Sequence, residues 1–165
     1  MINKKICMLG SFSVGKTSLV QQYVHSIFSD KYLSTVSVKI SKKELNLDGA
    51  DVTLVLWDME GKDLYMDVNI SYLRGAMGYF LVIDGTRRET LQVALELRNI
   101  AVNLIGPQVP YYFLLNKADL ESEWEVSNDD LELLRDQGIP FLKASAKTGL
   151  GVENAFTGLT KAMLL

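Results

Sequence analysis

The chain has 165 residues, of which 48% are hydrophobic and 22% are charged. This length predicts one domain, and this composition excludes a disordered, collagen-like or membrane-spanning chain. The 17 Lys and Arg residues against 20 Asp and Glu residues give a formal net charge of -3. Because no global positive field exists, we do not expect nucleic acid as a partner, and an anion would have to bind at a local site.

The single cysteine and the two chain ends bear on the compartment. Cys7 cannot form an internal disulfide and lies in an apolar run, which is typical of a core thiol in a reducing compartment. The first apolar run is too short for a signal sequence or a membrane span. Residue 2 is Ile and the C-terminal segment has no cysteine, so we expect no lipid anchor in this chain. We expect a cytoplasmic monomer.

Short apolar runs alternate with helical patterns along the chain, which is typical of a parallel sheet covered by helices on both faces. An edge strand is predicted over 36–47, where apolar and polar residues alternate before the turn Asp48-Gly49. We therefore expect an α/β fold over 1–165 as a single domain. It would be a three-layer sandwich with a six-stranded, mostly parallel sheet, one antiparallel edge strand and about five helices on both faces. Near-continuous apolar runs predict buried strands over 6–9, 52–57, 79–83 and 111–115. A further strand is expected after Pro140. A helix is expected over 18–24, and apolar residues three and four positions apart predict helices over 94–104 and 152–163.

A phosphate-binding motif directly follows the first predicted strand. Residues 10–17 read GSFSVGKT, which satisfies the P-loop pattern G-x-x-x-x-G-K-[ST], and they run into a predicted helix. Backbone N–H groups and the helix N-terminus would bind phosphate, Lys16 would reach the terminal phosphates, and the Thr17 hydroxyl would ligate Mg²⁺. The predicted phosphate-binding residues are Gly10, Ser13, Val14, Gly15, Lys16, Thr17 and Ser18.

The segment 116–119, which reads NKAD, follows the predicted strand 111–115 and indicates the base. The Asp119 carboxylate can accept two hydrogen bonds at once, from N1–H and from the 2-amino group of guanine, whereas adenine presents no such pair of donors. Taken alone, N-K-x-D is a weak pattern that could be a solvated loop. Together with the phosphate loop it predicts a guanine nucleotide site, and a P-loop ATPase or kinase is the competing interpretation.

From about Lys5 to Met163 the sequence resembles the Ras superfamily of small GTPases, and within it the Rab-like branch. Besides the two motifs above, residues 57–61 read WDMEG, 72–76 read YLRGA and 145–149 read SAKTG, in the family's order and at close to its spacings. The resemblance implies one G domain that binds GTP or GDP with Mg²⁺. It also implies a molecular switch that hydrolyses GTP to GDP and phosphate.

The resemblance implies roles for individual residues around the base. Phe28 would pack against the guanine ring, Lys117 would line its other face, and Asn116 would tie the loops together. The Ala146 N–H would meet the guanine O6, which also argues against an ATPase. The implied base-binding set is Phe28, Asn116, Lys117, Asp119, Ser145, Ala146 and Lys147.

The resemblance also implies two switch segments around the phosphates. Thr35 would ligate Mg²⁺ together with Thr17, although its alternative is an ordinary strand-edge threonine. Asp58 would hold Mg²⁺ through a water, and the Gly61 N–H would meet the γ-phosphate. Effector, exchange-factor and activating proteins would bind through the segments 29–40 and 59–76.

The second switch is atypical, because Lys62 stands where active relatives carry the glutamine that orients the attacking water. An ammonium group has donors only, so it cannot accept a hydrogen bond from water while it donates to phosphate. Glu60 could accept that bond instead, pair with Lys62, or repel the triphosphate. We expect slow intrinsic hydrolysis. The alternative is a guanine-nucleotide-binding scaffold without meaningful turnover. Phe12 favours this alternative, because its bulk on the phosphate loop can crowd the arginine that an activating protein inserts. The predicted catalytic residues are Lys16, Thr35, Glu60, Gly61 and Lys62.

Overall fold

A computed structural model of the chain describes residues 1–29, 38–59 and 71–165. Over these ranges the chain forms six strands, four α-helices and two short 3-10 helices, labelled η. In chain order they are β1 (Ile2–Gly10), α1 (Lys16–His25), β2 (Val38–Leu47), β3 (Ala50–Met59), η1 (Ser71–Leu73), β4 (Gly78–Asp84), α3 (Glu89–Ile105), β5 (Tyr111–Asn116), η2 (Ala118–Glu123), α4 (Asn128–Asp136), β6 (Phe141–Lys143) and α5 (Val152–Leu164).

The strands form one sheet in the order β2-β3-β1-β4-β5-β6. The β2 and β3 pair is antiparallel, whereas the other pairs in the described residues are parallel. Asp48 and Gly49 connect β2 to β3 with φ of 52° and 88°, and positive φ at both positions is what a tight two-residue hairpin needs. The predicted α/β fold with an antiparallel edge strand is therefore confirmed.

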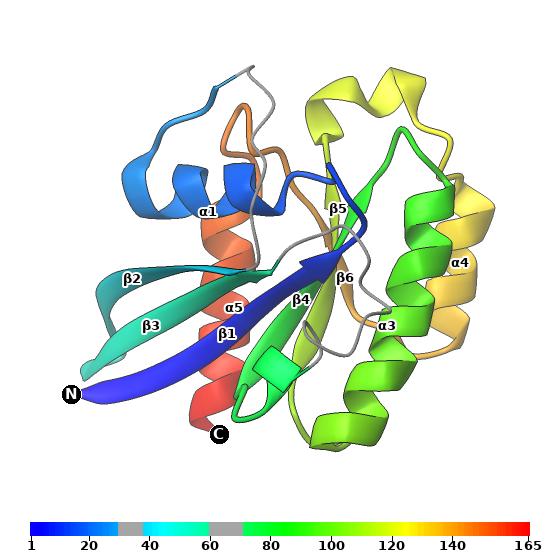
Figure 1. Ribbon diagram of the computed structural model, residues 1–165. Coiled ribbons are helices and arrows are strands. Elements are labelled where there is room, and N and C mark those ends of the chain that lie inside the picture. The colour runs from blue at the N-terminus through cyan, green and yellow to red at the C-terminus, as the bar shows by residue number, and fades with distance from the viewer. Residues whose placement is uncertain (30–37, 60–70) are drawn as a thin grey trace.

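Both faces of the central strands are apolar, so helices cover both. In β1, Ile6 and Met8 point into one core with α1 and α5. Cys7 and Leu9 point the other way, into a second core with α3 and α4. Successive side chains of a strand alternate between the faces, and the result is the expected three-layer arrangement of helices, sheet and helices (Figure 1). None of the helices in the described ranges combines the length and hydropathy that a membrane crossing requires.

The parallel strands bring their carboxyl ends to one edge of the sheet. Gly10 at the end of β1 pairs with Val82 of β4, and Asp84 pairs with Asn116 at the ends of β4 and β5. Asp58 lies opposite Met8 near the end of β3. The loops that leave these strands emerge together, at the position where ligands bind in open α/β sheets.

Candidate functional site

The loop between β1 and α1 adopts a conformation that two of its residues make specific. Gly15 has φ +102°, and a Cβ there would lie 2.2 Å from Asn116 Nδ2, so both the backbone and the available space require glycine. Ser13 has φ 63°, a left-handed conformation that costs a non-glycine residue roughly 1–2 kcal/mol. A loop of this kind before a helix N-terminus can aim successive N–H groups at an anion.

Lys16 supplies the positive charge of this loop. Its Nζ donates to the carbonyl oxygens of Gly10 at 3.0 Å and Ser11 at 2.9 Å, and the side chain is buried. Burial lowers the pKa of Lys16 to about 8; Asp58 opposes this decrease and Arg87 adds to it. A bound phosphate would raise the pKa of Lys16 again, because a nearby negative charge favours an ammonium group.

Asn116 joins the phosphate loop to a second loop. Its Nδ2 donates to the Val14 carbonyl at 3.0 Å, and its Oδ1 accepts from the Ala146 N–H at 3.1 Å. From α1, Gln22 donates to the Ala146 carbonyl at 2.7 Å. The Ala146 N–H is thus engaged within the protein, so it would have to share that bond in order to reach a base.

Asp119 lies on η2, three residues after Asn116, and its side chain is exposed. The hydroxyl of Ser145 donates to its Oδ1 at 2.7 Å and accepts from the Thr148 N–H at 3.0 Å. A carboxylate has about four lone-pair sites, so this bond orients Asp119 and leaves it able to accept further donors. Lys117 just before it has φ 69°, which turns the chain sharply after β5.

Thr17 and Asp58 bring together two side-chain oxygen atoms of the kind that Mg²⁺ prefers. The Thr17 hydroxyl donates to Asp58 Oδ2 at 2.5 Å, and Asp58 is 1% exposed. Among the described residues, no group of three or more His, Cys, Asp or Glu side chains is placed to hold a metal ion. Mg²⁺ in nucleotide sites usually takes one or two protein ligands and fills the rest with phosphates and waters, so this pair fits that ion.

The remaining predicted site residues are less enclosed or lie outside the described residues. Phe28 and Lys147 are exposed, and Ser18 is partly buried within α1. Predictions for Thr35, Glu60, Gly61 and Lys62 fall in 30–37 and 60–70, outside the described residues.

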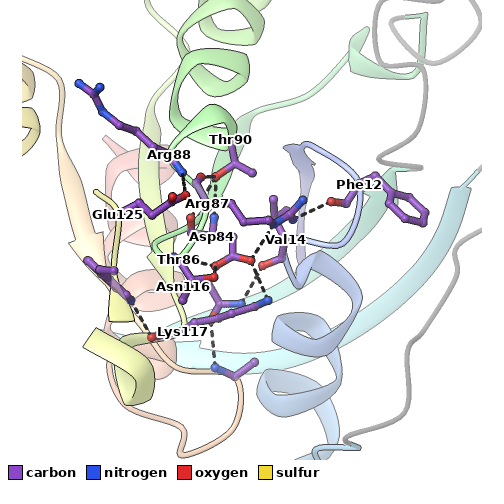
Figure 2. A network of polar contacts seen from close by, with 12 residues as sticks. Phe12, Val14, Asp84, Thr86, Arg87, Arg88, Thr90, Asn116, Lys117 and Glu125 are labelled. Carbon is purple, nitrogen blue, oxygen red and sulfur yellow. Dashed lines mark hydrogen bonds and ion pairs between the residues drawn. The ribbon is translucent and has the colours of Figure 1, made fainter. Parts of the chain in front are cut away.

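A polar cluster around Asp84 was not predicted from the sequence. Asp84 is 1% exposed and forms ion pairs with Lys117 at 2.7 Å and Arg87 at 3.0 Å. Figure 2 shows this cluster between the phosphate loop and the loop after β5. The only sequence signal was a polar residue that ends a buried strand, and its partners could not be read from it.

The fold, with the phosphate loop at the carboxyl edge of the sheet, is that of the P-loop class of nucleotide-binding proteins. The sequence pattern of the Ras family matches residues 5–165, and the chain belongs to this family, as a Rab-like small GTPase.

Individual relatives agree with this assignment. Over 163 residues the chain is 30% identical to Ras-related protein Rab-13 of Canis lupus familiaris, covering 98% of this chain and 80% of that protein. It is 33% identical over 162 residues to Ras-related protein Rab-8B of Bos taurus, covering 97% and 78%. It is 32% identical over 161 residues to Ras-related protein Rab-4 of Dictyostelium discoideum, again covering 97% and 78%.

Proposed function

We propose that the protein is a monomeric switch that binds GTP or GDP with Mg²⁺ and hydrolyses GTP slowly. The observation that carries this proposal is the pair of hydrogen bonds of Asn116, which holds Val14 of the phosphate loop and Ala146 of the β6–α5 loop at once. The two loops are therefore one unit, as a ligand with a phosphate end and a base end requires.

At the base end, Asp119 would accept the N1–H and the 2-amino group of guanine. Its orientation by Ser145 supports this role, because the hydroxyl bond fixes the carboxylate before a ligand arrives. Phe28 and Lys117 would lie on the two faces of the ring. The exposure of Phe28 and Asp119 is in keeping with a base that enters from the surface.

At the phosphate end, the N–H groups of the loop and Lys16 would bind the β- and γ-phosphates. Thr17, Asp58 and Thr35 would hold Mg²⁺, and the Gly61 N–H would meet the γ-phosphate. When bound, Mg²⁺ neutralises charge that develops on the phosphate oxygens. The protein contributes fixed donors, which need no rearrangement when that charge develops.

Slow hydrolysis follows from the residues of the second switch. Lys62 cannot accept a hydrogen bond from the attacking water, and phosphoryl transfer depends on positioning and electrostatics. Glu60 is the remaining candidate acceptor. A scaffold without turnover is the second candidate function; the exposed Phe12 side chain on the phosphate loop favours it, because bulk there obstructs an activating arginine. Hydrolysis rates with and without a candidate activating protein separate the two.

Partner proteins would bind the segments 29–40 and 59–76, whose conformations would depend on the bound nucleotide. The direct test of the nucleotide is chromatography of the small molecules released when the purified protein is denatured. We expect a guanosine nucleotide in about one-to-one ratio with the chain. Release of an adenosine nucleotide would overturn the proposal.

A further inference from the structure

Arg87 connects the phosphate loop to the β4–α3 connection. Its Nη2 donates to the carbonyl oxygen of Phe12 at 2.8 Å, and its Nε donates to Asp84 Oδ2 at 3.0 Å. The planar guanidinium makes both bonds with one rigid fork. The Phe12 carbonyl is therefore held from outside the loop, by a side chain 75 positions away in the sequence.

The anchor of Arg87 is itself fixed. The Asp84 carboxylate accepts three more hydrogen bonds besides the one from Arg87. Two come from Thr86, whose backbone N–H lies at 2.9 Å and whose hydroxyl lies at 2.7 Å, and the third comes from Lys117 Nζ at 2.7 Å. Burial acts to raise the pKa of Asp84, but these hydrogen bonds outweigh it and the net shift is downward. An ionised, buried carboxylate thus links Arg87 to Lys117 of the loop that follows β5, here called the base loop (Figure 2).

The geometry of the peptide group converts the carbonyl contact into an N–H orientation. The Phe12 carbonyl and the Ser13 N–H belong to one peptide group, and no cis peptide occurs in the described residues. In a planar trans peptide the two bonds point in opposite directions. Arg87 therefore turns the Ser13 N–H away from itself, as Asn116 does for the Gly15 N–H by holding the Val14 carbonyl.

The residue between these two held carbonyls needs such support. Ser13 has φ 63°, and a non-glycine residue stays in this conformation only when its surroundings determine it. Its neighbours in the chain, Phe12 and Val14, are each held through the carbonyl oxygen by a side chain from the carboxyl end of the sheet. Besides Lys16, which binds the Gly10 and Ser11 carbonyls from within the loop, two side chains from outside hold it, and only Asn116 was predicted from the sequence to do so.

We propose that Arg87 is a positioning residue for phosphate binding: by holding the Phe12 carbonyl it directs the Ser13 N–H into the phosphate site, and through Asp84 it couples that site to Lys117 of the base loop. This inference rests on the proposed function, because it concerns how the same nucleotide is held. Arg87 itself needs no contact with the nucleotide.

The test compares three full-length variants, Arg87→Ala, Arg87→Lys and Arg88→Ala. Arg88→Ala is the matched control, since Arg88 carries the same charge next in sequence but pairs with Asp130 of α4. The first readout is the dissociation rate of fluorescently labelled GDP in magnesium buffer. The second is the amide chemical shift of Ser13 in protein with ¹⁵N-labelled serine, with and without GDP.

We expect Arg87→Ala to release GDP about tenfold faster, which is the value of one charge-assisted hydrogen bond, and to lose the GDP-induced shift of the Ser13 amide. Arg87→Lys keeps the charge but not the fork, so it should also release GDP faster than wild type. Arg88→Ala should retain the wild-type rate and shift.

Wild-type rates and shifts in Arg87→Ala, in a protein that binds GDP, would overturn this inference alone. Wild-type values of both readouts in Arg87→Lys would overturn it as well, because the positive charge at position 87 would then explain the effect without the guanidinium fork. If the wild-type protein bound no guanine nucleotide, this inference and the proposed function would both be wrong.

Discussion

The indole Nε1 of Trp124 donates a hydrogen bond to the carbonyl of Lys117 at 2.9 Å. This bond supports a residue with φ 69° at the start of the base loop. The same indole lies flat on Gly85, where an added Cβ would come within 2.1–2.5 Å of three ring atoms. Contact between the end of β4 and the base loop therefore depends on the absence of a side chain at Gly85.

Gly85→Ala should weaken guanine nucleotide binding. The methyl group would displace the Trp124 indole and break its bond to Lys117, and the loss of one hydrogen bond predicts roughly three- to tenfold weaker GDP binding. In a Trp57→Phe background, Trp124 emission reports its displacement directly. Gly158→Ala is the control, since a Cβ there would lie 3.7 Å from the nearest atom, the Tyr112 hydroxyl oxygen. Unchanged GDP affinity and emission in Gly85→Ala would contradict this account of Trp124.

Asp119→Asn should shift the base preference from guanine toward xanthine. The amide replaces one acceptor by a donor, which matches the 2-oxo group of xanthine in place of the 2-amino group of guanine. Equilibrium titration with GDP and XDP measures the exchange of preference. Glu123→Gln removes an exposed carboxylate from the same element, η2, and should leave both affinities as they are. Retained guanine affinity in Asp119→Asn would show that the base pocket is assigned to the wrong residue.

The Asp84 cluster predicts a pH-dependent contribution to stability. Burial acts to raise the pKa of Asp84, but its hydrogen bonds outweigh this and place the pKa below the ordinary value of 3.8. A lowered folded-state pKa means that the stabilisation is complete above the unfolded-state value and is lost as the pH falls through the folded-state value.

We therefore expect Asp84→Asn to reduce the free energy of unfolding by about 1–3 kcal/mol near neutral pH. The difference from wild type should shrink as the pH falls from about 4 through the lowered folded-state pKa, because the wild-type carboxylate then becomes neutral like the amide. Urea unfolding at a series of pH values measures this difference. Asp48→Asn is the control, since Asp48 is 80% exposed and 3.9 Å from Lys161, and such surface pairs contribute little. A difference that stays constant down to the acid unfolding limit would be the contrary result.

Lys62→Gln should speed GTP hydrolysis. Glutamine can both accept from water and donate to phosphate, whereas lysine only donates, so we expect an increase of about tenfold or more in the single-turnover rate. Glu60→Ala assigns the role of the neighbouring carboxylate: a slower rate indicates that Glu60 accepts from water, and a faster rate indicates repulsion or pairing with Lys62. The same rate in wild type and both variants would remove these residues from the mechanism.

The sequence predicted the features that depend on consecutive residues. The strands β4 and β5 were found because both of their faces are buried, which makes them continuous apolar runs. The phosphate loop and the segment 116–119 were found because each motif lies within a few consecutive residues. The short strand β6 was indicated only by Pro140, since its three residues carry little pattern.

The contacts between loops could not be predicted in the same way. Arg87 and Phe12 are 75 positions apart, and nothing in either neighbourhood signals the other. Trp124 and Gly85 meet only because the loops after β4 and β5 leave the sheet side by side. Such pairs depend on strand order and loop path, and these emerge only when the whole sheet has formed.

The proposed guanine nucleotide site combines the phosphate loop with Asp119. Calorimetric titration of nucleotide-free protein with GDP, GTP and ADP in magnesium buffer tests it most directly. We expect a saturating heat of binding, with one site per chain, for both guanosine nucleotides and none for ADP. Equal heats for ADP and GDP, or no heat with either guanosine nucleotide, would contradict it.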